Sequence, residues 1–162
     1  MAKIFFSTIG EDSHRISESN EKALILGGVK FDNENFSLVA NSDGDVVLHS
    51  LTNAISGATT KNILGKVADD MCKSGITDSK EYLKEAQKYL GDISIVHVSI
   101  SIEAKKPKLA KKIPEMRASI AKLLGIKENQ VGITATTGEG LTEFGKGYGI
   151  FVTTLLSCSK EV

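Results

Sequence analysis

The 162-residue chain contains no tryptophan, only two prolines and two cysteines, and aromatic residues make up 6% of it. Cys72 and Cys158 lie far apart and lack the close spacing of a cysteine metal site. We therefore expect two unpaired thiols in a reducing, cytoplasmic setting. The scarcity of aromatic side chains argues against a surface that stacks on nucleic-acid bases.

An excess of charge of one sign is also missing, because 20 lysines and arginines balance 20 aspartates and glutamates. Bulk electrostatic capture of nucleic acid or of an anionic membrane is therefore not expected. No hydrophobic run approaches the roughly 18 residues of a membrane span. The apolar stretch in residues 1–6 is too short for a signal peptide and is typical of a first strand. We expect neither a nucleic-acid nor a membrane partner.

The hydrophobic pattern of residues 1–162 predicts a single domain that mixes helices and strands, without repeats or linkers. Residues 59–75 fit either a helix or a mobile flap, and Asp78–Glu81 resembles a capping box. Strands are predicted over residues 3–8, 23–31 (two strands around a Gly-Gly turn), 93–103, 131–135 and a last segment ending near 157. Helices are predicted over residues 47–58, from the Asp78–Glu81 capping box to Gly91, and from Pro114 to Gly125. Loops are predicted over residues 16–22 and 32–35.

The strand predicted at 93–103 alternates between an apolar and a polar side. We interpret His97, on the polar side, as a structural or interfacial residue rather than a metal ligand. The expected apolar side consists of Val96, Val98, Ile100 and Ile102.

The stretch from Asn41 to His49 indicates a turn that begins a helix. Ser42 and Asp43 are favoured at helix N-caps, and Gly44 permits a close approach of the backbone to a ligand. The free N–H groups at a helix start suit an anion. We therefore expect this turn to face a phosphate.

His49 lies beside the apolar stripe of this predicted helix. Asp45 and Asn53, one turn before and after it, share its face and could support it as a metal ligand. A surface histidine with ordinary helix contacts is the alternative. Asp12 and His14 are two residues apart, so on an extended backbone both side chains point to one side. That motif is short and occurs often by chance, so taken alone it favours a solvated loop.

Two further stretches suit phosphate chemistry. Residues 104–112 contain five lysines around Pro107, which indicates either a solvated basic loop or a phosphate or nucleotide contact. Residues 136–140 combine two hydroxyls, two glycines and the carboxylate of Glu139. This combination is typical of a contact to phosphate and a divalent cation.

Taken together, these blocks resemble the 2-C-methyl-D-erythritol 2,4-cyclodiphosphate synthase family over nearly the full length. The resemblance rests on Asp12-x-His14-Arg15, Leu26–Val29, Ser42–His49, Asp78-Ser79, Glu103–Leu109 with Ile113–Arg117, and Ala135–Leu141. It implies an α+β domain, a mixed β-sheet with helices packed on one face, that trimerises through the sheets. Active sites would lie between neighbouring subunits.

The resemblance also implies the chemistry. A cytidine diphosphate-linked methylerythritol phosphate would be cyclised with release of CMP. Asp12, His14 and His49 would bind Zn²⁺, leaving an open position as a catalytic zinc requires, and Glu139 would hold Mg²⁺ or Mn²⁺ on the diphosphate. Asn41 and Thr137 would act in catalysis. Substrate would contact Asp12, Ser13, His14, Asn41, Ser42, Gly65, Ala104, Lys105, Lys106, Pro107, Lys108, Leu109, Ala110, Thr136, Thr137, Gly138, Glu139 and Lys146.

Several positions depart from the family pattern. Asn41 stands where many members have a histidine, and it can donate a hydrogen bond but carry no charge. Asn53 replaces an aspartate, and residues 62–65 lack the aspartate of the family's Gly-Asp-Ile-Gly. Lys146 replaces an arginine and Tyr148 a glutamate near the trimer axis. Two alternatives therefore stay open: a related enzyme for another nucleoside diphosphate, and a non-catalytic trimer that binds zinc and a nucleotide.

Overall fold

A mixed five-stranded sheet with strand order β4-β1-β7-β5-β6 forms one layer of the protein. In this computed structural model, which describes residues 1–162, the long strands β1 and β7 pair antiparallel from end to end. β5 pairs antiparallel with β7, and β6 runs parallel to β5. The strands are β1 (Lys3–Ser17), β4 (Ser37–Leu38), β5 (Ser94–Glu103), β6 (Val131–Thr136) and β7 (Gly149–Glu161).

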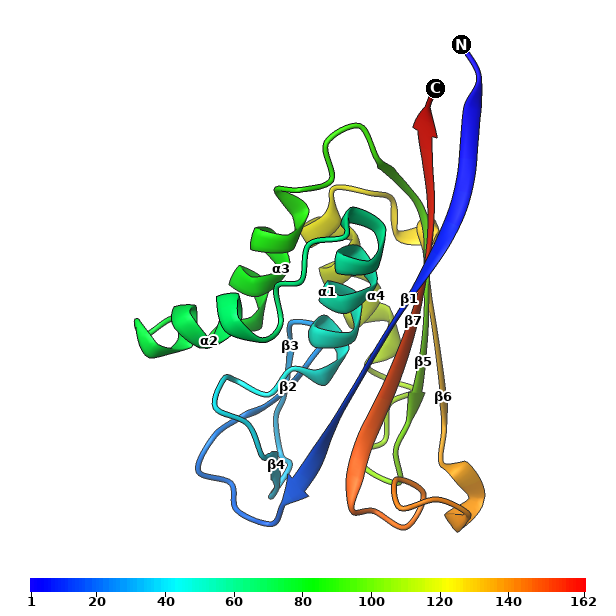
Figure 1. Ribbon diagram of the computed structural model, residues 1–162. Coiled ribbons are helices and arrows are strands. Elements are labelled where there is room, and N and C mark those ends of the chain that lie inside the picture. Colours follow the sequence, from blue (N-terminus) through cyan, green and yellow to red (C-terminus); the bar gives the residue numbers. More distant parts are fainter.

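Four helices cover one side of this sheet (Figure 1). A separate hairpin of β2 and β3 lies beneath them, and the expected Gly-Gly turn joins its strands. The helices are α1 (Val46–Thr59), α2 (Lys66–Lys73), α3 (Ser79–Gln87) and α4 (Ile113–Leu124), and the smaller elements are β2 (Leu24–Leu26), β3 (Val29–Phe31), η1 (Glu128–Gln130) and η2 (Gly138–Gly140). The α+β class and the mixed sheet are thus confirmed.

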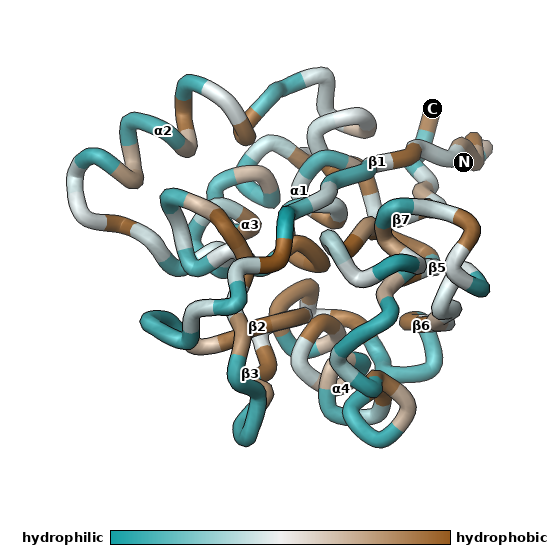
Figure 2. Tube along the Cα trace, turned by 90° about the horizontal axis from the view of Figure 1, so that it is seen from below, coloured by the Kyte–Doolittle hydropathy of each residue, from teal (hydrophilic) through white to brown (hydrophobic).

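The core lies between α1, α4 and the sheet, and in Figure 2 hydrophobic segments gather there while hydrophilic segments dominate the outer loops. Val98, Ile100 and Ile102 of β5 are all fully or almost fully buried. Gly10 lets α1 approach β1 closely, because a Cβ atom at Gly10 would lie 2.2 Å from the carbonyl oxygen of Ser50. This close contact sets the distance between α1 and β1, the strand that carries Asp12 and His14.

Two strand predictions were too short. β1 continues through Ile16 and Ser17, which we expected in a loop, because they pair with β4. β7 runs on to Glu161 and pairs with the start of β1. Val96 was also misplaced: a β-bulge between Ile95 and His97 breaks the alternation, so that Val96 is 38% exposed.

Two helix boundaries also differ from the predictions. Asp45, not Ser42 or Asp43, caps α1, since its carboxylate accepts from the backbone N–H of Leu48 at 3.0 Å. Gly91 does not end α3, which stops at Gln87 because the next amides bond three residues back, in tighter turns.

At the start of α3, Asp78 caps the helix, but the two reciprocal bonds of the expected capping box do not form. Asp78 accepts from the amide of Lys80, while Glu81 pairs with Lys84 instead of reaching back. Within residues 59–75 the helical alternative is confirmed for Lys66–Lys73. No helix of the protein is both long enough and apolar enough to cross a bilayer.

Candidate metal centre and active site

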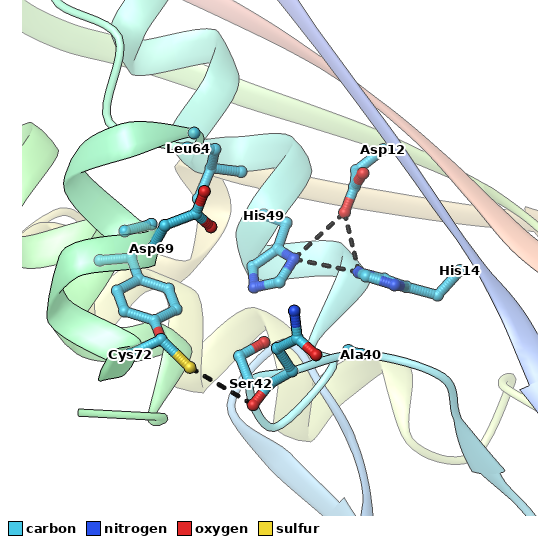
Figure 3. Close-up of a pocket in the computed structure, with 12 residues that line it drawn as sticks. Asp12, His14, Ala40, Ser42, His49, Leu64, Asp69 and Cys72 are labelled. Atoms are coloured by element: carbon cyan, nitrogen blue, oxygen red, sulfur yellow. Dashed lines mark hydrogen bonds and ion pairs between the residues drawn. The ribbon is translucent and has the colours of Figure 1, made fainter. Parts of the chain in front are cut away.

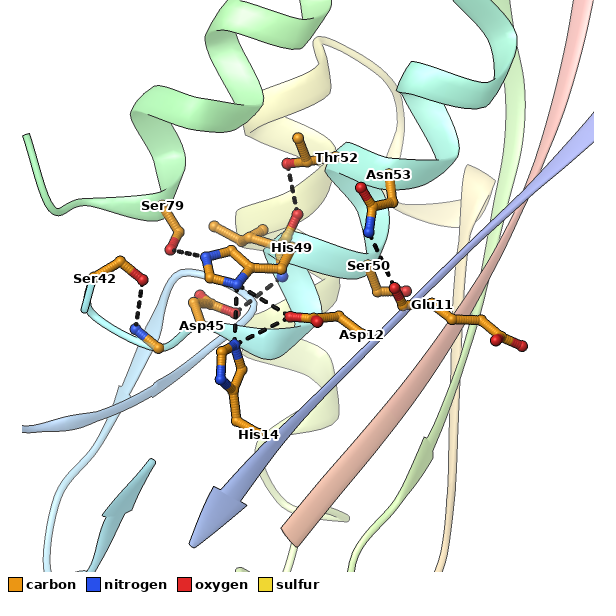
Figure 4. A network of polar contacts seen from close by, with 12 residues as sticks. Glu11, Asp12, His14, Ser42, Asp45, His49, Ser50, Thr52, Asn53 and Ser79 are labelled. Carbon is orange, nitrogen blue, oxygen red and sulfur yellow. Dashed lines mark hydrogen bonds and ion pairs between the residues drawn. The ribbon is translucent and has the colours of Figure 1, made fainter. Parts of the chain in front are cut away.

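Three ligand-type atoms converge between β1 and α1 (Figures 3 and 4). Asp12 and His14 point to the same side of β1, and His49 comes from the first turn of α1. Asp12 Oδ2 lies 3.1 Å from His14 Nε2 and 3.1 Å from His49 Nδ1. The two histidine nitrogens are also 3.1 Å apart. The sequence prediction that these three residues meet is therefore confirmed.

The tautomer of His14 is set by its other ring nitrogen. Nδ1 lies 3.0 Å from the carbonyl oxygen of Val39, which can only accept, so Nδ1 carries the proton. In neutral His14, Nε2 then presents a lone pair to Asp12 and His49. Burial works to lower the pKa of His14, but its hydrogen bond to Asp12 and the charge of Asp12 outweigh burial and raise it.

The outer ring nitrogen of His49 also has a hydrogen-bond partner, but not one of the residues that sequence spacing suggested. Its Nε2 lies 2.8 Å from the hydroxyl of Ser79, at the start of α3. Asp45 instead accepts from the amides of Gly27 and Gly28 at 2.8 and 2.7 Å. Asn53 donates to the carbonyl of Glu11 (Figure 4). The expected support of His49 by Asp45 and Asn53 was wrong, because both side chains satisfy backbone groups of other segments.

The residues present fit a divalent transition metal. A carboxylate and two imidazole nitrogens form a common N₂O ligand set for zinc, and ligand distances of about 2.0–2.2 Å place neighbouring ligand atoms about 3 Å apart. The observed separations of 3.1 Å agree with this spacing. Burial alone would raise the pKa of Asp12, but hydrogen bonds to His14 and His49 lower it to about 2. The carboxylate is therefore charged and ready to hold a cation.

A cavity of about 320 Å³ opens onto these three residues. The turn before α1 and the inner face of α2 form its walls, and Cys72 of α2 donates a weak hydrogen bond to the carbonyl of Asn41. Its lining consists of Asp12, His14, Ala40, Asn41, Ser42, His49, Leu64, Gly65, Ala68, Asp69, Cys72 and Tyr82. The structure thus brings Asn41, Ser42 and Gly65 to the candidate metal centre.

The N–H groups at the helix start are not all free for an anion as expected, because Asp45 accepts the hydrogen bond of the Leu48 amide. The turn contributes Asn41 and Ser42 instead. Lys22 holds it in place by donating to the carbonyl oxygens of Ala40 and Ser42. A phosphate in the cavity would therefore meet side chains of the turn rather than helix amides.

The remaining predicted substrate residues lie in a second region, outside this cavity. The parallel pairing of β5 and β6 joins its two segments, 104–110 and 136–139, and the amide of Ala104 donates to the carbonyl of Thr136. Thr137 accepts from the amide of Glu139 at 3.3 Å, and Lys146 pairs with Glu143 at 2.9 Å. Within one chain, Glu139 is not part of the Asp12, His14 and His49 cluster.

Ser13 also lies outside the cavity. It is next to Asp12 in β1, so its side chain points to the opposite side of the strand. There it lines a different hollow of about 240 Å³ together with Phe144 and Tyr148.

Sequence reasoning named Gly65 but missed the three residues of α2 that line the cavity with it, Ala68, Asp69 and Cys72. Their spacing of three and four residues places them on one face of a helix, and this was the available signal. Ser79 was noted only in the helix-start motif, because nothing in the sequence connects it to His49.

Comparison with known proteins matches residues 5–158 to the model of the YgbB family. The chain belongs to the YgbB family. The match runs from β1 into β7 and so includes Asp12, His14 and His49.

Members of the YgbB family with curated names are close in sequence. A Chlamydia caviae protein named 2-C-methyl-D-erythritol 2,4-cyclodiphosphate synthase is 52% identical over 145 residues, which cover 88% of this chain and 82% of that protein. A Chlamydia trachomatis serovar D protein with the same name is 50% identical over 145 residues, with 88% and 81% covered.

Solved structures of such proteins share the fold. The bifunctional IspDF of Campylobacter jejuni superposes with a TM-score of 0.89 at 30% identity, covering 99% of this chain and 43% of that one. A CDP complex of IspF from Plasmodium falciparum superposes with a TM-score of 0.83 at 26% identity, covering 98% and 97%.

Proposed function

We propose that this protein is a 2-C-methyl-D-erythritol 2,4-cyclodiphosphate synthase. It would convert 4-diphosphocytidyl-2-C-methyl-D-erythritol 2-phosphate into the cyclic diphosphate and CMP. The observation that carries the proposal is the set of Asp12, His14 and His49, whose ligand atoms meet at a cavity bordered by Asn41 and Ser42. The curated names of relatives that are about half identical support it.

The reaction needs little acid or base catalysis, because an existing phosphate is the nucleophile. An oxygen of the 2-phosphate bonds to the β-phosphorus, and the bond from that phosphorus to the bridging oxygen breaks, so CMP leaves with the oxygen. The work of the protein is to hold these groups in line and to stabilise their charge. The Asn41 amide and the Ser42 hydroxyl, both from residues that line the cavity, would donate hydrogen bonds to phosphate oxygens there.

Zn²⁺ held by Asp12, His14 and His49, and Mg²⁺ or Mn²⁺ held by Glu139, would supply Lewis-acid polarisation and neutralise phosphate charge. Glu139 is an exposed carboxylate that belongs to no cluster of three or more ligand-type residues in its own chain. Magnesium commonly binds through one carboxylate and substrate phosphates, so this residue fits a cation that arrives with the diphosphate.

A complete site requires the 104–110 and 136–139 segments to meet the cavity. We propose that a neighbouring copy supplies them, in a homotrimer formed through the sheets, with Thr137 and the cytidine contacts of residues 104–110 coming from that copy. The open side of the sheet supports this, since Phe5, Ile9 and Leu155 are 71%, 59% and 46% exposed there. Light scattering should give three times the monomer mass, and a monomer would remove the shared site.

One observation favours a second candidate, a related enzyme that acts on another nucleoside diphosphate. Ile63 occupies the position of the family's flap aspartate, and it is only 2% exposed, packed in the core. The wall that would contact the sugar alcohol is thus built differently, with Asp69 as the carboxylate that lines it.

The deciding experiment is CMP release from the diphosphocytidyl substrate with Zn²⁺ and Mg²⁺ present, repeated after chelation. Metal-dependent CMP release would establish the synthase. Absence of CMP from folded, zinc-loaded protein would reject it, and cleavage of another nucleoside diphosphate would then support the second candidate. Tight CMP binding without any turnover would instead indicate a non-catalytic binder.

A further inference from the structure

We infer that Asp43 and Ser79 form a hydrogen-bonded relay that holds His49 in the one tautomer able to bind a metal through Nδ1. The Asp43–Ser79–His49 relay joins three separate segments: the turn before α1, the first residue of α3, and the first turn of α1. The inference rests on the metal site of the proposed function and makes Asp43 and Ser79 positioning residues.

The direction of the relay follows from its chemistry. Ser79 donates its hydroxyl hydrogen to Asp43 Oδ1 in a short hydrogen bond, and a carboxylate can only accept. The hydroxyl has no second hydrogen, so toward His49 Nε2, at 2.8 Å, it must act as the acceptor. Nε2 therefore carries the proton of a neutral His49. Nδ1 is left with a free lone pair that faces Asp12 and His14.

Asp43 is anchored so that it cannot turn away. Its Oδ2 accepts from the amide of Ser79 at 3.0 Å, and its Oδ1 also accepts from the amide of Asp45 at 3.0 Å. Its own amide donates to the carbonyl of Thr77 at 2.9 Å. Both ends of the carboxylate are thus fixed by backbone groups of the two segments that it joins.

Burial prevents water from substituting for the relay. Ser79 is 0% exposed and His49 is 7% exposed. A buried N–H group that loses its acceptor finds no water in its place, so the full free-energy cost of an unsatisfied donor applies. The hydrogen bond from the backbone amide of Ser79 to Asp43 would be enough to hold the two segments together. The hydroxyl adds the connection to His49, which a purely structural tie does not need.

The relay makes His49 the counterpart of His14. His14 is protonated at Nδ1 by the Val39 carbonyl and presents Nε2, whereas His49 is protonated at Nε2 and presents Nδ1. When both histidines are neutral, their two lone pairs and one of Asp12 therefore meet with no proton between them. Such an arrangement is favourable only around a cation.

The first test needs no variant. The chain has only three histidines, so nitrogen-15 NMR of their six ring nitrogens is tractable. In zinc-loaded protein at neutral pH we expect His49 protonated at Nε2 with Nδ1 bound to metal, and His14 the reverse. A proton on Nδ1 of His49 would overturn the relay.

The second test measures Zn²⁺ affinity by competition with a chromophoric chelator. Ser79→Ala removes the acceptor, and Asp43→Asn can donate to Ser79 and reverse the relay, so each should weaken zinc binding about 10- to 100-fold. Ser50→Ala is the matched control. It loses an equally buried hydroxyl on the residue after His49, one that bonds to Gly10 and Thr154 instead.

The absorption spectrum of the Co²⁺-substituted protein gives a second readout. Ser79→Ala and Asp43→Asn should change it, and Ser50→Ala should not. Wild-type zinc affinity and an unchanged cobalt spectrum in Ser79→Ala would refute the relay. Because these readouts are independent of turnover, wild-type protein that binds zinc but releases no CMP would reject the proposed function and leave the relay standing.

Discussion

The candidate metal centre and the 104–110 and 136–139 region are prepared for their ligands to different degrees. At the metal centre, each histidine turns one ring nitrogen inward and hydrogen-bonds through the other. The partner is the Val39 carbonyl for His14 and the Ser79 hydroxyl for His49. In the second region, Lys105, Lys108 and Glu139 are exposed. Lys106 pairs with Glu18 and Lys146 with Glu143, both acidic groups at the surface.

This difference teaches which part of the chemistry a single chain prearranges. Fixing a metal ligand in advance removes the cost of ordering it when the ion binds. The second region keeps its apolar side chains Ala104 and Leu109 buried and leaves its polar groups in water. Exposed lysines and an exposed carboxylate acquire a fixed geometry only from a substrate, a cation or a neighbouring copy. Four predictions test this contrast.

The largest effect is expected from His49→Ala. Loss of a direct ligand should abolish Zn²⁺ binding and reduce CMP release by more than the roughly 100-fold typical of groups behind a ligand. Elemental analysis of the purified variant measures the zinc. Asn53→Ala, one turn along α1 and bonded only to Glu11, is the control and should keep its zinc. A normal zinc content in His49→Ala would reject the metal centre.

Glu139→Gln should separate the two regions. We expect an unchanged Zn²⁺ content but a loss of about 100-fold in Mg²⁺-dependent CMP release, because a group that neutralises transition-state charge is removed. Turnover against Mg²⁺ concentration measures the effect. Glu143→Gln removes a nearby exposed carboxylate that pairs with Lys146, and it should behave almost as wild type. If Glu139→Gln also lost zinc, the regions would not be independent.

Asp69→Ala tests the wall that α2 adds to the metal centre. If Asp69 accepts hydrogen bonds from substrate hydroxyls, its removal should raise KM about 10-fold and leave CMP affinity unchanged. Asp70→Ala is the matched control, because Asp70 neighbours it on α2, pairs with Lys66 and lies outside the cavity. Equal KM values for the two variants would show that the substrate does not contact Asp69.

The smallest effect concerns the stability of metal-free protein. Hydrogen bonds to two histidines lower the pKa of Asp12 to about 2 against the raising effect of burial. The charged carboxylate therefore stabilises the fold above its ordinary pKa of 3.8, and this contribution is lost as pH falls toward 2. His14, whose pKa is raised, stabilises below its ordinary 6.5 and loses its contribution as pH rises through the raised value.

Asp12→Asn should accordingly lower the free energy of unfolding by about 1 kcal/mol near pH 5.5, an amount that allows for solvent screening of a partly exposed group. The difference from wild type should shrink as the pH approaches 2. Denaturant titration in the presence of a chelator measures it. A difference that stays constant from about pH 2 to pH 6 would contradict the interaction between Asp12 and the histidines.

Much of the metal centre could be predicted from local spacing. Asp12 and His14 share a side of an extended strand because side chains alternate, and His49 sits at a helical position beside an apolar stripe. The boundaries were less accessible. Ile16 and Ser17 extend β1 only because β4 is present to pair with them, and Val96 leaves the alternation at a bulge that pairs with β7.

By itself, the sequence determined the α+β class and the main helices and strands, since these follow from periodicities. The family resemblance, which is also read from the sequence, implied that Asp12, His14 and His49 bind one metal, whereas their spacing alone left other interpretations open. Only the tertiary structure decided which residues hydrogen-bond to those three. Asp45 and Asn53 lie on the face of α1 that carries His49, yet both bond elsewhere, and Ser79, thirty residues away, contacts the ring. A hydrogen-bond partner depends on how whole helices and strands pack, and the spacing of residues within one helix does not predict that packing.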